Sequence, residues 1–168
     1  MTDVHEFVAK FTGARAAFDS LEAVLNSAYA LACEARGRYQ RAGQTAMSTL
    51  AGNAVDVVNG VFGVGRPYLD EFSSLSDVMT DLPQEGNDER IISVIDVVFE
   101  VIGTSTPDIV GPLTASAAEV RADLGVTSPR LVTALEKTAE TAGSATKAAD
   151  ALRETSTAYR KTLMADSA

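Results

Sequence analysis

The chain has 168 residues, a formal net charge of −9 and an apolar fraction of 46%. This length predicts a single domain, residues 1–168, with a sizeable core. The apolar content excludes wholesale disorder, while 6% aromatics and the lack of Trp indicate a core of small aliphatic side chains. One cysteine, Cys33, cannot form an intramolecular disulfide framework, so nothing in the sequence requires an oxidising compartment.

The negative charge is concentrated in the middle third of the chain. Residues 57–112 carry ten acidic and two basic side chains, whereas the flanking thirds are close to neutral. Such a field repels phosphate backbones and anionic lipid surfaces, and it favours a cationic partner. We therefore expect no binding to nucleic acid. A simpler interpretation is that the acidic side chains only keep an apolar segment in solution.

Targeting and membrane-spanning segments are not predicted. The first residues, MTDVHEFVAKF, are charged and amphipathic, without an apolar run before a small-residue cleavage site. The longest apolar run, residues 91–102, is too short to span a bilayer and contains Asp96 and Glu100. We expect a soluble protein that is cytoplasmic, or exported without a cleavable signal peptide.

Two long helical segments, residues 3–42 and 129–164, carry an alternating three- and four-residue apolar repeat. Such spacing directs one narrow stripe toward a partner helix, as in a coiled coil. When opposed positions add up to about 167, large side chains meet small ones, as Phe18 meets Ala149. This complementarity predicts that the two helices pack antiparallel, because a core fills best when large opposes small.

Loop signals predict two further segments between these helices, residues 44–82 and 88–124. Residues 83–88 are rich in loop formers, and Asn87 or Asp88 can cap the helix that follows. Ser128 is a predicted N-cap, with Pro129 at the first helical position. Four segments with short connections indicate an all-α fold, an up-down-up-down antiparallel four-helix bundle.

Both middle segments contain a predicted interruption. In the second segment a helix over residues 45–62 is followed by residues 63–67 and a new helix over 68–82. The third segment is interrupted at residues 103–107 and resumes at Asp108. Each interruption ends in a proline, which removes a backbone donor and crowds the preceding turn, so we expect kinks or breaks there. In antiparallel neighbours the two interruptions lie at the same height, which predicts a hinge, a bulge or a pocket.

The apolar run 91–102 is the preferred candidate for a binding surface. It carries more apolar side chains than a helix with two neighbours needs, and a helix that is apolar nearly all round is expected to be buried on most sides. We therefore predict that a partner protein or a second copy binds through Ile92, Asp96, Phe99 and Glu100. The alternative is that the polar positions only form a solvated stripe.

A second candidate site is a mid-bundle pocket for a small molecule, in a sensory or ligand-binding bundle. Here the backbone at Gly63 and Gly65 would lie beside Arg66, which would pair with an anion. Thr104 or Thr106 would donate hydrogen bonds. The shared height of the two interruptions is the basis for this alternative.

Catalytic and metal-binding sets are not recognisable in the sequence. His5 is the only histidine and lies in the first helical turn, so a Glu-x-x-His pair is not available for a di-iron bundle. His5 and Cys33 together cannot complete a four-ligand zinc site. The glycines of residues 60–65 have neither dinucleotide-fingerprint nor P-loop spacing. We expect a non-enzymatic scaffold or interaction protein without a metal or cofactor.

The run AADALRETSTAYRK, residues 148–161, resembles the final helix of actinobacterial type VII (ESX) secretion substrates and associated helical proteins. Their Ala-rich hairpins often end in a similar Tyr-containing turn, which Tyr159 represents here. The chain differs from this family in two respects. It has no Trp-x-Gly turn, and four residues after Tyr159 it has Leu163 where the family usually has an acidic residue. The resemblance implies a secreted helical protein as a further functional alternative.

Overall fold

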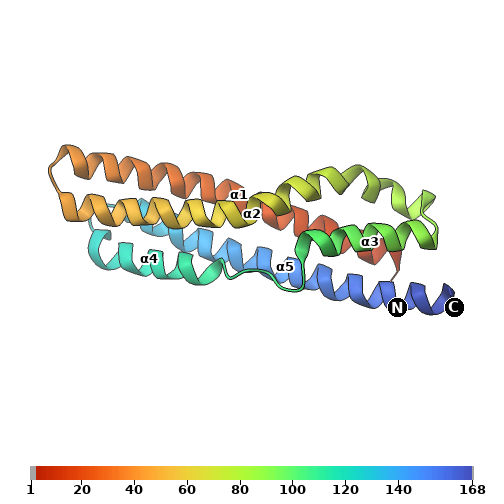
Figure 1. Cartoon of the computed structure of the whole chain (residues 1–168). Coiled ribbons are helices and arrows are strands. Elements are labelled where there is room, and N and C mark those ends of the chain that lie inside the picture. Colours follow the sequence, from red (N-terminus) through yellow and green to blue (C-terminus); the bar gives the residue numbers. More distant parts are fainter. Residues whose placement is uncertain (1–2, 168) are drawn as a thin grey trace. The chain divides into compact units, whose positions relative to one another are not determined.

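A computed structural model describes residues 3–167 as five helices joined by short connections (Figure 1). The described part of the chain contains no strand, which confirms the all-α prediction. The helices are α1 (Val4–Arg41), α2 (Thr45–Glu85), α3 (Asp88–Ile102), α4 (Val110–Leu124) and α5 (Pro129–Ser167).

The chain divides into two compact units. Unit 1 consists of Met1–Phe18, Arg66–Pro107 and Ala145–Ala168, and unit 2 consists of Asp19–Gly65 and Asp108–Ser144. Helices α1, α2 and α5 contribute residues to both units, whereas α3 belongs to unit 1 and α4 to unit 2.

Aromatic rings from α1 and α2 fill the core of unit 1. The rings of Phe18 and Tyr68 stack with their centroids 4.8 Å apart, and Phe11 meets Phe72 edge to face at 5.3 Å. Offset and edge-to-face pairs of this kind add about 0.5–1.5 kcal/mol to the stabilisation from burial. Helix α3 covers this core with its apolar stripe, Ile91, Val94, Ile95, Val98 and Ile102.

Small side chains dominate the core of unit 2. Ala28 and Ala32 of α1 are fully buried, as is Ala142 of α5. Thr138 of α5 is also fully buried, and its hydroxyl donates a hydrogen bond to the Ala134 carbonyl of the same helix at 2.6 Å. The same hydroxyl lies 3.3 Å from the Val24 carbonyl of α1. A side chain as short as threonine reaches the backbone of α1 only when α1 and α5 lie close together. Such close packing requires small residues between the two helices, which the Ala-rich sequence supplies.

Within each unit α1 and α5 run antiparallel. In unit 1 the early residue Phe7 packs on the late residue Tyr159, with ring centroids 6.1 Å apart. In unit 2 the late α1 residue Tyr39 bonds through its hydroxyl to Ser128, which precedes α5. The paired numbers add up to 166 and 167, in agreement with the predicted register.

The predicted interruption at residues 63–67 is not a break, because α2 continues through Pro67 as one helix of 41 residues. Pro83 also lies inside α2, so the predicted loop over residues 83–88 shortens to Gly86 and Asn87. Buried side chains explain the continuity: Val61 before the proline and Tyr68 after it are each anchored in the core of their unit. Tertiary packing thus outweighs the proline's cost of about 3 kcal/mol in a helix interior.

The third predicted segment is divided in two, since α3 ends at Ile102 and α4 begins at Val110. Gly103 ends α3 with a φ of 62°, a left-handed conformation that glycine adopts without a Cβ penalty. The Asp108 carboxylate accepts hydrogen bonds from the N–H groups of Val110 and Gly111, at 3.1 and 3.0 Å. The sequence had indicated that the helix resumes at Asp108. In the structure Asp108 instead precedes α4 and caps its first turn.

Candidate functional site

Helix α3 has an inward face that is buried and an outward face that is both acidic and apolar. Asp96 and Glu100 are exposed, whereas Ile92 and Phe99 are half-buried. Val97 is 38% exposed, which makes it one of the few large apolar side chains open to solvent. The outward face therefore combines charge with apolar surface that the neighbouring helices of unit 1 leave uncovered.

A hollow of about 360 Å³ lies between α2 and α3 in unit 1. We call it the acidic groove; it is lined by Pro67 and Glu71 of α2 and by Val97, Glu100 and Val101 of α3. Three of its lining side chains, Pro67, Val97 and Val101, are apolar, and each helix adds one exposed carboxylate, Glu71 or Glu100. Such a combination suits a ligand group with an apolar body and a positive charge.

The four residues predicted as a partner surface have different roles in the structure. Glu100 lines the acidic groove. The Asp96 carboxylate instead accepts a hydrogen bond from the Arg160 guanidinium of α5 at 2.8 Å. That hydrogen bond, with the charge of Asp96, raises the pKa of Arg160. Ile92 and Phe99 flank the outward face and do not line the groove.

Sequence reasoning missed three groove residues, Pro67, Glu71 and Val101, and did not single out Val97. A signal was available on α3, because Val97 and Val101 are four residues apart and share a face with Glu100 between them. Nothing in the sequence of α2 distinguishes Glu71 from its other acidic residues. Its role follows only from the packing of α2 beside α3.

The surroundings of the acidic groove are strongly negative. From residue 66 to residue 102 the chain carries nine acidic and two basic side chains, all of them exposed. One of the two cations, Arg66, forms an ion pair with Asp70 at 3.5 Å. A surface with one dominant sign of charge attracts cationic partners over distances of about a Debye length, roughly 8 Å at physiological salt.

A hollow of similar volume in unit 2 provides a comparison. It also measures about 360 Å³, and its floor is formed by small side chains of α4 and α5. Its charged residues, Arg121 and Glu136, form an ion pair with each other, so the rim is neutral. The two hollows are therefore alike in volume, but the acidic groove is the more polar and carries acidic charge that is unpaired within its described lining, whereas the second hollow is mostly apolar.

The residues predicted for a mid-bundle pocket do not form one cluster within a single unit. Gly63 and Gly65 belong to unit 2, whereas Arg66, Thr104 and Thr106 belong to unit 1. Arg66 pairs with Asp70, and the Thr106 hydroxyl accepts a hydrogen bond from Arg153 at 3.1 Å.

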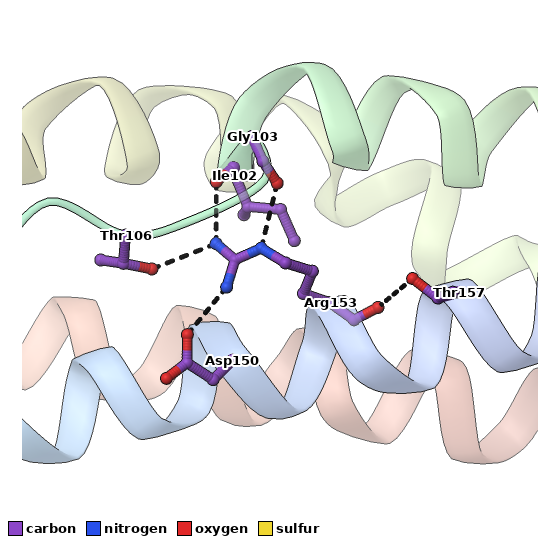
Figure 2. A network of polar contacts seen from close by, with 6 residues as sticks. All are labelled: Ile102, Gly103, Thr106, Asp150, Arg153 and Thr157. Atoms are coloured by element: carbon purple, nitrogen blue, oxygen red, sulfur yellow. Dashed lines mark hydrogen bonds and ion pairs between the residues drawn. The ribbon is translucent and has the colours of Figure 1, made fainter.

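Arg153 of α5 organises the end of α3 (Figure 2). Its guanidinium donates to the carbonyls of Ile102 and Gly103, at 2.9 and 3.0 Å, and to the hydroxyl of Thr106. Asp150 accepts a further hydrogen bond from the same group at 2.7 Å. Helix α3 has no basic residue in its own last turn, so Arg153 supplies the cation that complements the negative end of the helix dipole. The side chain is only 15% exposed, which identifies it as a structural anchor.

A second polar cluster lies in unit 2, where α1 ends beside the turn before α5. The hydroxyl of Tyr39 bonds to the hydroxyls of Thr127 and Ser128, at 2.6 and 2.5 Å, and Arg38 donates to Ser128 at 2.8 Å. Burial opposes ionisation of the phenol, but these hydrogen bonds and the Arg38 charge together lower the pKa of Tyr39. The Ser128 hydroxyl, predicted as an N-cap, is thus used to join α1 to α5.

Tyr159, which carries the resemblance to type VII substrates, is a core residue here. It is 6% exposed and packs on Phe7. Burial raises the pKa of Tyr159, and the nearby charges of Asp88 and Asp3 raise it further.

No group of three or more His, Cys, Asp or Glu in the described chain is arranged to hold a metal ion. His5 is exposed and Cys33 is half-buried. Among the helices of residues 3–167, none has the length and apolar content needed to cross a membrane. Comparison with protein-family models, curated proteins and solved structures finds no match to this chain.

Proposed function

We propose that this chain is a non-enzymatic interaction protein that binds another protein chain through α2 and α3 of unit 1. In this proposal its helices follow an up-down-up-down order, with α3 and α4 together forming the third segment. The acidic groove is the observation that carries the proposal, because it leaves apolar side chains in solvent beside exposed carboxylates.

The energetics require an interface larger than the groove itself. Fully burying a valine contributes about 1.5–3 kcal/mol, so covering the exposed 38% of Val97 contributes about 0.6–1 kcal/mol. Association costs at least about 4 kcal/mol in lost translational and rotational freedom. A partner must therefore also contact the outer surfaces of α2 and α3, where a standard interface covers about 800 Å² on each partner.

Replacement of Val97 by Asp tests this proposal. The change places a charge among the apolar lining residues of the acidic groove, and the 38% exposure of Val97 lets the new carboxylate reach solvent in the monomer. Val126→Asp is the matched control, since Val126 lies in unit 2 and is 96% exposed. We expect Val97→Asp to lose a partner that co-purifies from the native host, or to lower the mass measured by light scattering, while Val126→Asp does neither. Retention of both properties in Val97→Asp would contradict the proposal.

The cellular location follows from the same proposal in one of two forms. The chain acts in the cytoplasm, or it acts after export as the resemblance of residues 148–161 to type VII substrates implies. Detection of the protein in the culture filtrate of its host, with a cytoplasmic marker as control, separates the two forms.

A further inference from the structure

We propose that the occupant of the acidic groove is a basic amphipathic helix from another protein. An apolar side chain of this helix would sit on Val97 and Val101, and Lys or Arg side chains would lie beside Glu71 and Glu100. The inference rests on the proposed function and specifies its partner class.

The chemistry of the groove favours a helix over an extended peptide. Its apolar lining consists of side chains of Pro67, Val97 and Val101, and proline has no backbone N–H to offer. An extended peptide that binds by strand addition needs the edge of a sheet, and residues 3–167 contain no strand. A helix satisfies its own backbone groups and presents side chains at a spacing of three and four residues. Val97 and Val101 have the same four-residue spacing on α3, so ridges of a third helix can pack between α2 and α3.

Charge complementarity favours a cationic occupant. Glu71 and Glu100 are exposed on opposite sides of the hollow, so a docked helix would meet a carboxylate on each flank. The nearby cation Arg66 is engaged with Asp70. An acidic helix would therefore face like charges on both sides, whereas a basic one would form an ion pair on each side.

A second copy docked groove to groove is disfavoured for the same reason. Such a symmetric contact would bring the carboxylates of Glu71 and Glu100 against their own counterparts. The surrounding surface adds to the repulsion, because nine of the eleven charged residues between positions 66 and 102 are acidic. A partner of different sequence avoids this conflict.

The lack of Trp in this chain provides a clean probe. A synthetic helix of about 18 residues, roughly five turns, would carry Leu on one face, Lys on the other and one Trp among the leucines. All Trp fluorescence then comes from the peptide, and its emission moves to shorter wavelength when the ring leaves water. Two further peptides serve as controls, one with Glu in place of Lys and one with the Leu/Lys composition in scrambled order.

We expect the Leu/Lys helix to bind the full chain and the two control peptides not to bind. Glu71→Gln with Glu100→Gln should weaken binding about two- to thirtyfold, the range expected for two exposed charge pairs. Glu119→Gln with Asp123→Asn is the matched control, because it removes two exposed charges from α4 in unit 2. This control should leave the affinity within about twofold of the wild type, since distant exposed charges are screened.

The apolar lining of the groove is tested separately from its two carboxylates. Val97→Asp should abolish the Trp shift, and Val97→Thr, which keeps the side-chain shape, should weaken binding less. Circular dichroism melts establish whether each variant is folded. If Val97→Asp is not folded, Val97→Thr alone tests the apolar contact.

Equal binding of the scrambled peptide, or equal weakening by the control pair on α4, would overturn the inference in favour of unspecific charge attraction. Preference for the Glu peptide would overturn it as well. A dimer in light scattering that Val97→Asp dissociates would assign the groove to a second copy. That last result would overturn this inference but support the proposed function. A native partner whose binding is unaffected by Val97→Asp would contradict the proposed function and, with it, the inference.

Discussion

Arg153 of α5 donates a hydrogen bond to the carbonyl of Ile102, the last residue of α3, across 51 positions of sequence. The same guanidinium also reaches Gly103 and Thr106, so one side chain holds both the helix end and the connection that follows. A helix end needs partners for its last carbonyls, and α3 obtains them from another helix.

Arg153→Ala should lower the free energy of unfolding of unit 1 by about 2–3 kcal/mol. The change leaves carbonyl groups without their charged donor, and hydrogen bonds to charged groups contribute about 1.5–3 kcal/mol. Arg153→Lys should recover only part of the loss, because an ammonium cannot reproduce the planar fork of donors. Urea denaturation gives the magnitude, and hydrogen exchange of the last α3 turn shows where protection is lost.

Arg160→Ala is the matched control on the same helix. Its partner Asp96 is exposed, and exposed ion pairs contribute little to stability. Equal losses for the two alanine variants would contradict the anchoring role of Arg153.

Ser156→Ala should raise the free energy of unfolding by about 1 kcal/mol. Ser156 is fully buried in unit 1, and its hydroxyl has no hydrogen-bond partner among the described residues. An unsatisfied buried polar group costs about 1–3 kcal/mol, and alanine removes it with little change in volume. Thr138→Val is the contrasting variant, since it removes a hydroxyl that does have acceptors, Ala134 and Val24. We expect urea denaturation to give a lower free energy of unfolding for Thr138→Val than for the wild type. If both variants were more stable, the gain would come from the added apolar character and not from removal of an unsatisfied hydroxyl.

Tyr39 should make the chain relatively more stable as the pH rises toward 10. Its pKa is lower in the folded chain than its ordinary value of 10.0, because hydrogen bonds and Arg38 together outweigh burial. A group with a depressed folded pKa contributes stability that is complete above the unfolded pKa and is lost as pH falls through the folded pKa. The difference in unfolding free energy between wild type and Tyr39→Phe should therefore grow as pH approaches 10.

Tyrosinate absorbance checks the assignment of this titration. One phenol of the folded chain should ionise below pH 10, and Tyr39→Phe should remove that step. Tyr159→Phe is the contrasting variant, because burial raises the pKa of Tyr159 and its loss should leave the early step in place. An early step that survives in Tyr39→Phe would contradict the prediction.

Ala145→Phe should lower the free energy of unfolding by about 1–3 kcal/mol through overpacking. Ala145 is fully buried in the α5 seam, so an added ring displaces its neighbours. The neighbouring Ser144 is exposed, and Ser144→Phe should therefore cost little. Thermal melts of the two variants provide the comparison, and an Ala145→Phe protein that melts like the parent would contradict close packing at this position.

Periodicity was sufficient to predict the seams of α1 and α5. The predicted seam of α1 consists of Val4, Phe7, Phe11, Ala14, Phe18, Leu21, Leu25, Ala28, Ala32, Ala35 and Tyr39. That of α5 consists of Leu131, Leu135, Thr138, Ala142, Ala145, Ala149, Leu152, Ser156, Tyr159 and Leu163. All these positions are buried, apart from Val4, which is half-buried. A repeat of three and four residues determines which side chains share a face, and that face must be covered. The antiparallel order followed from side-chain size, and the contacts of Phe7 with Tyr159 agree with it.

Pro67 shows the limit of local reasoning, because the helix does not break there. Its helix-breaking tendency is a local property, and the buried residues on either side of it decide the outcome through contacts with other helices. The pairing of Asp96 with Arg160 could not be predicted for a related reason. It joins residues 64 positions apart and depends on the rotation of α3 and α5 about their axes, which an apolar pattern fixes only approximately.

Arg153 also has a consequence for the order in which the chain is completed during synthesis. Domains form as the chain emerges from its N-terminal end. Helix α3 is made 51 residues before the side chain that caps its last carbonyl. Until α5 emerges, the C-terminal turn of α3 must obtain its partners from water and fray. A ribosome-bound fragment that ends before residue 153 should therefore contain an α3 whose final turn is cleaved by proteases. A longer fragment in which α5 has emerged should be protected at the same turn.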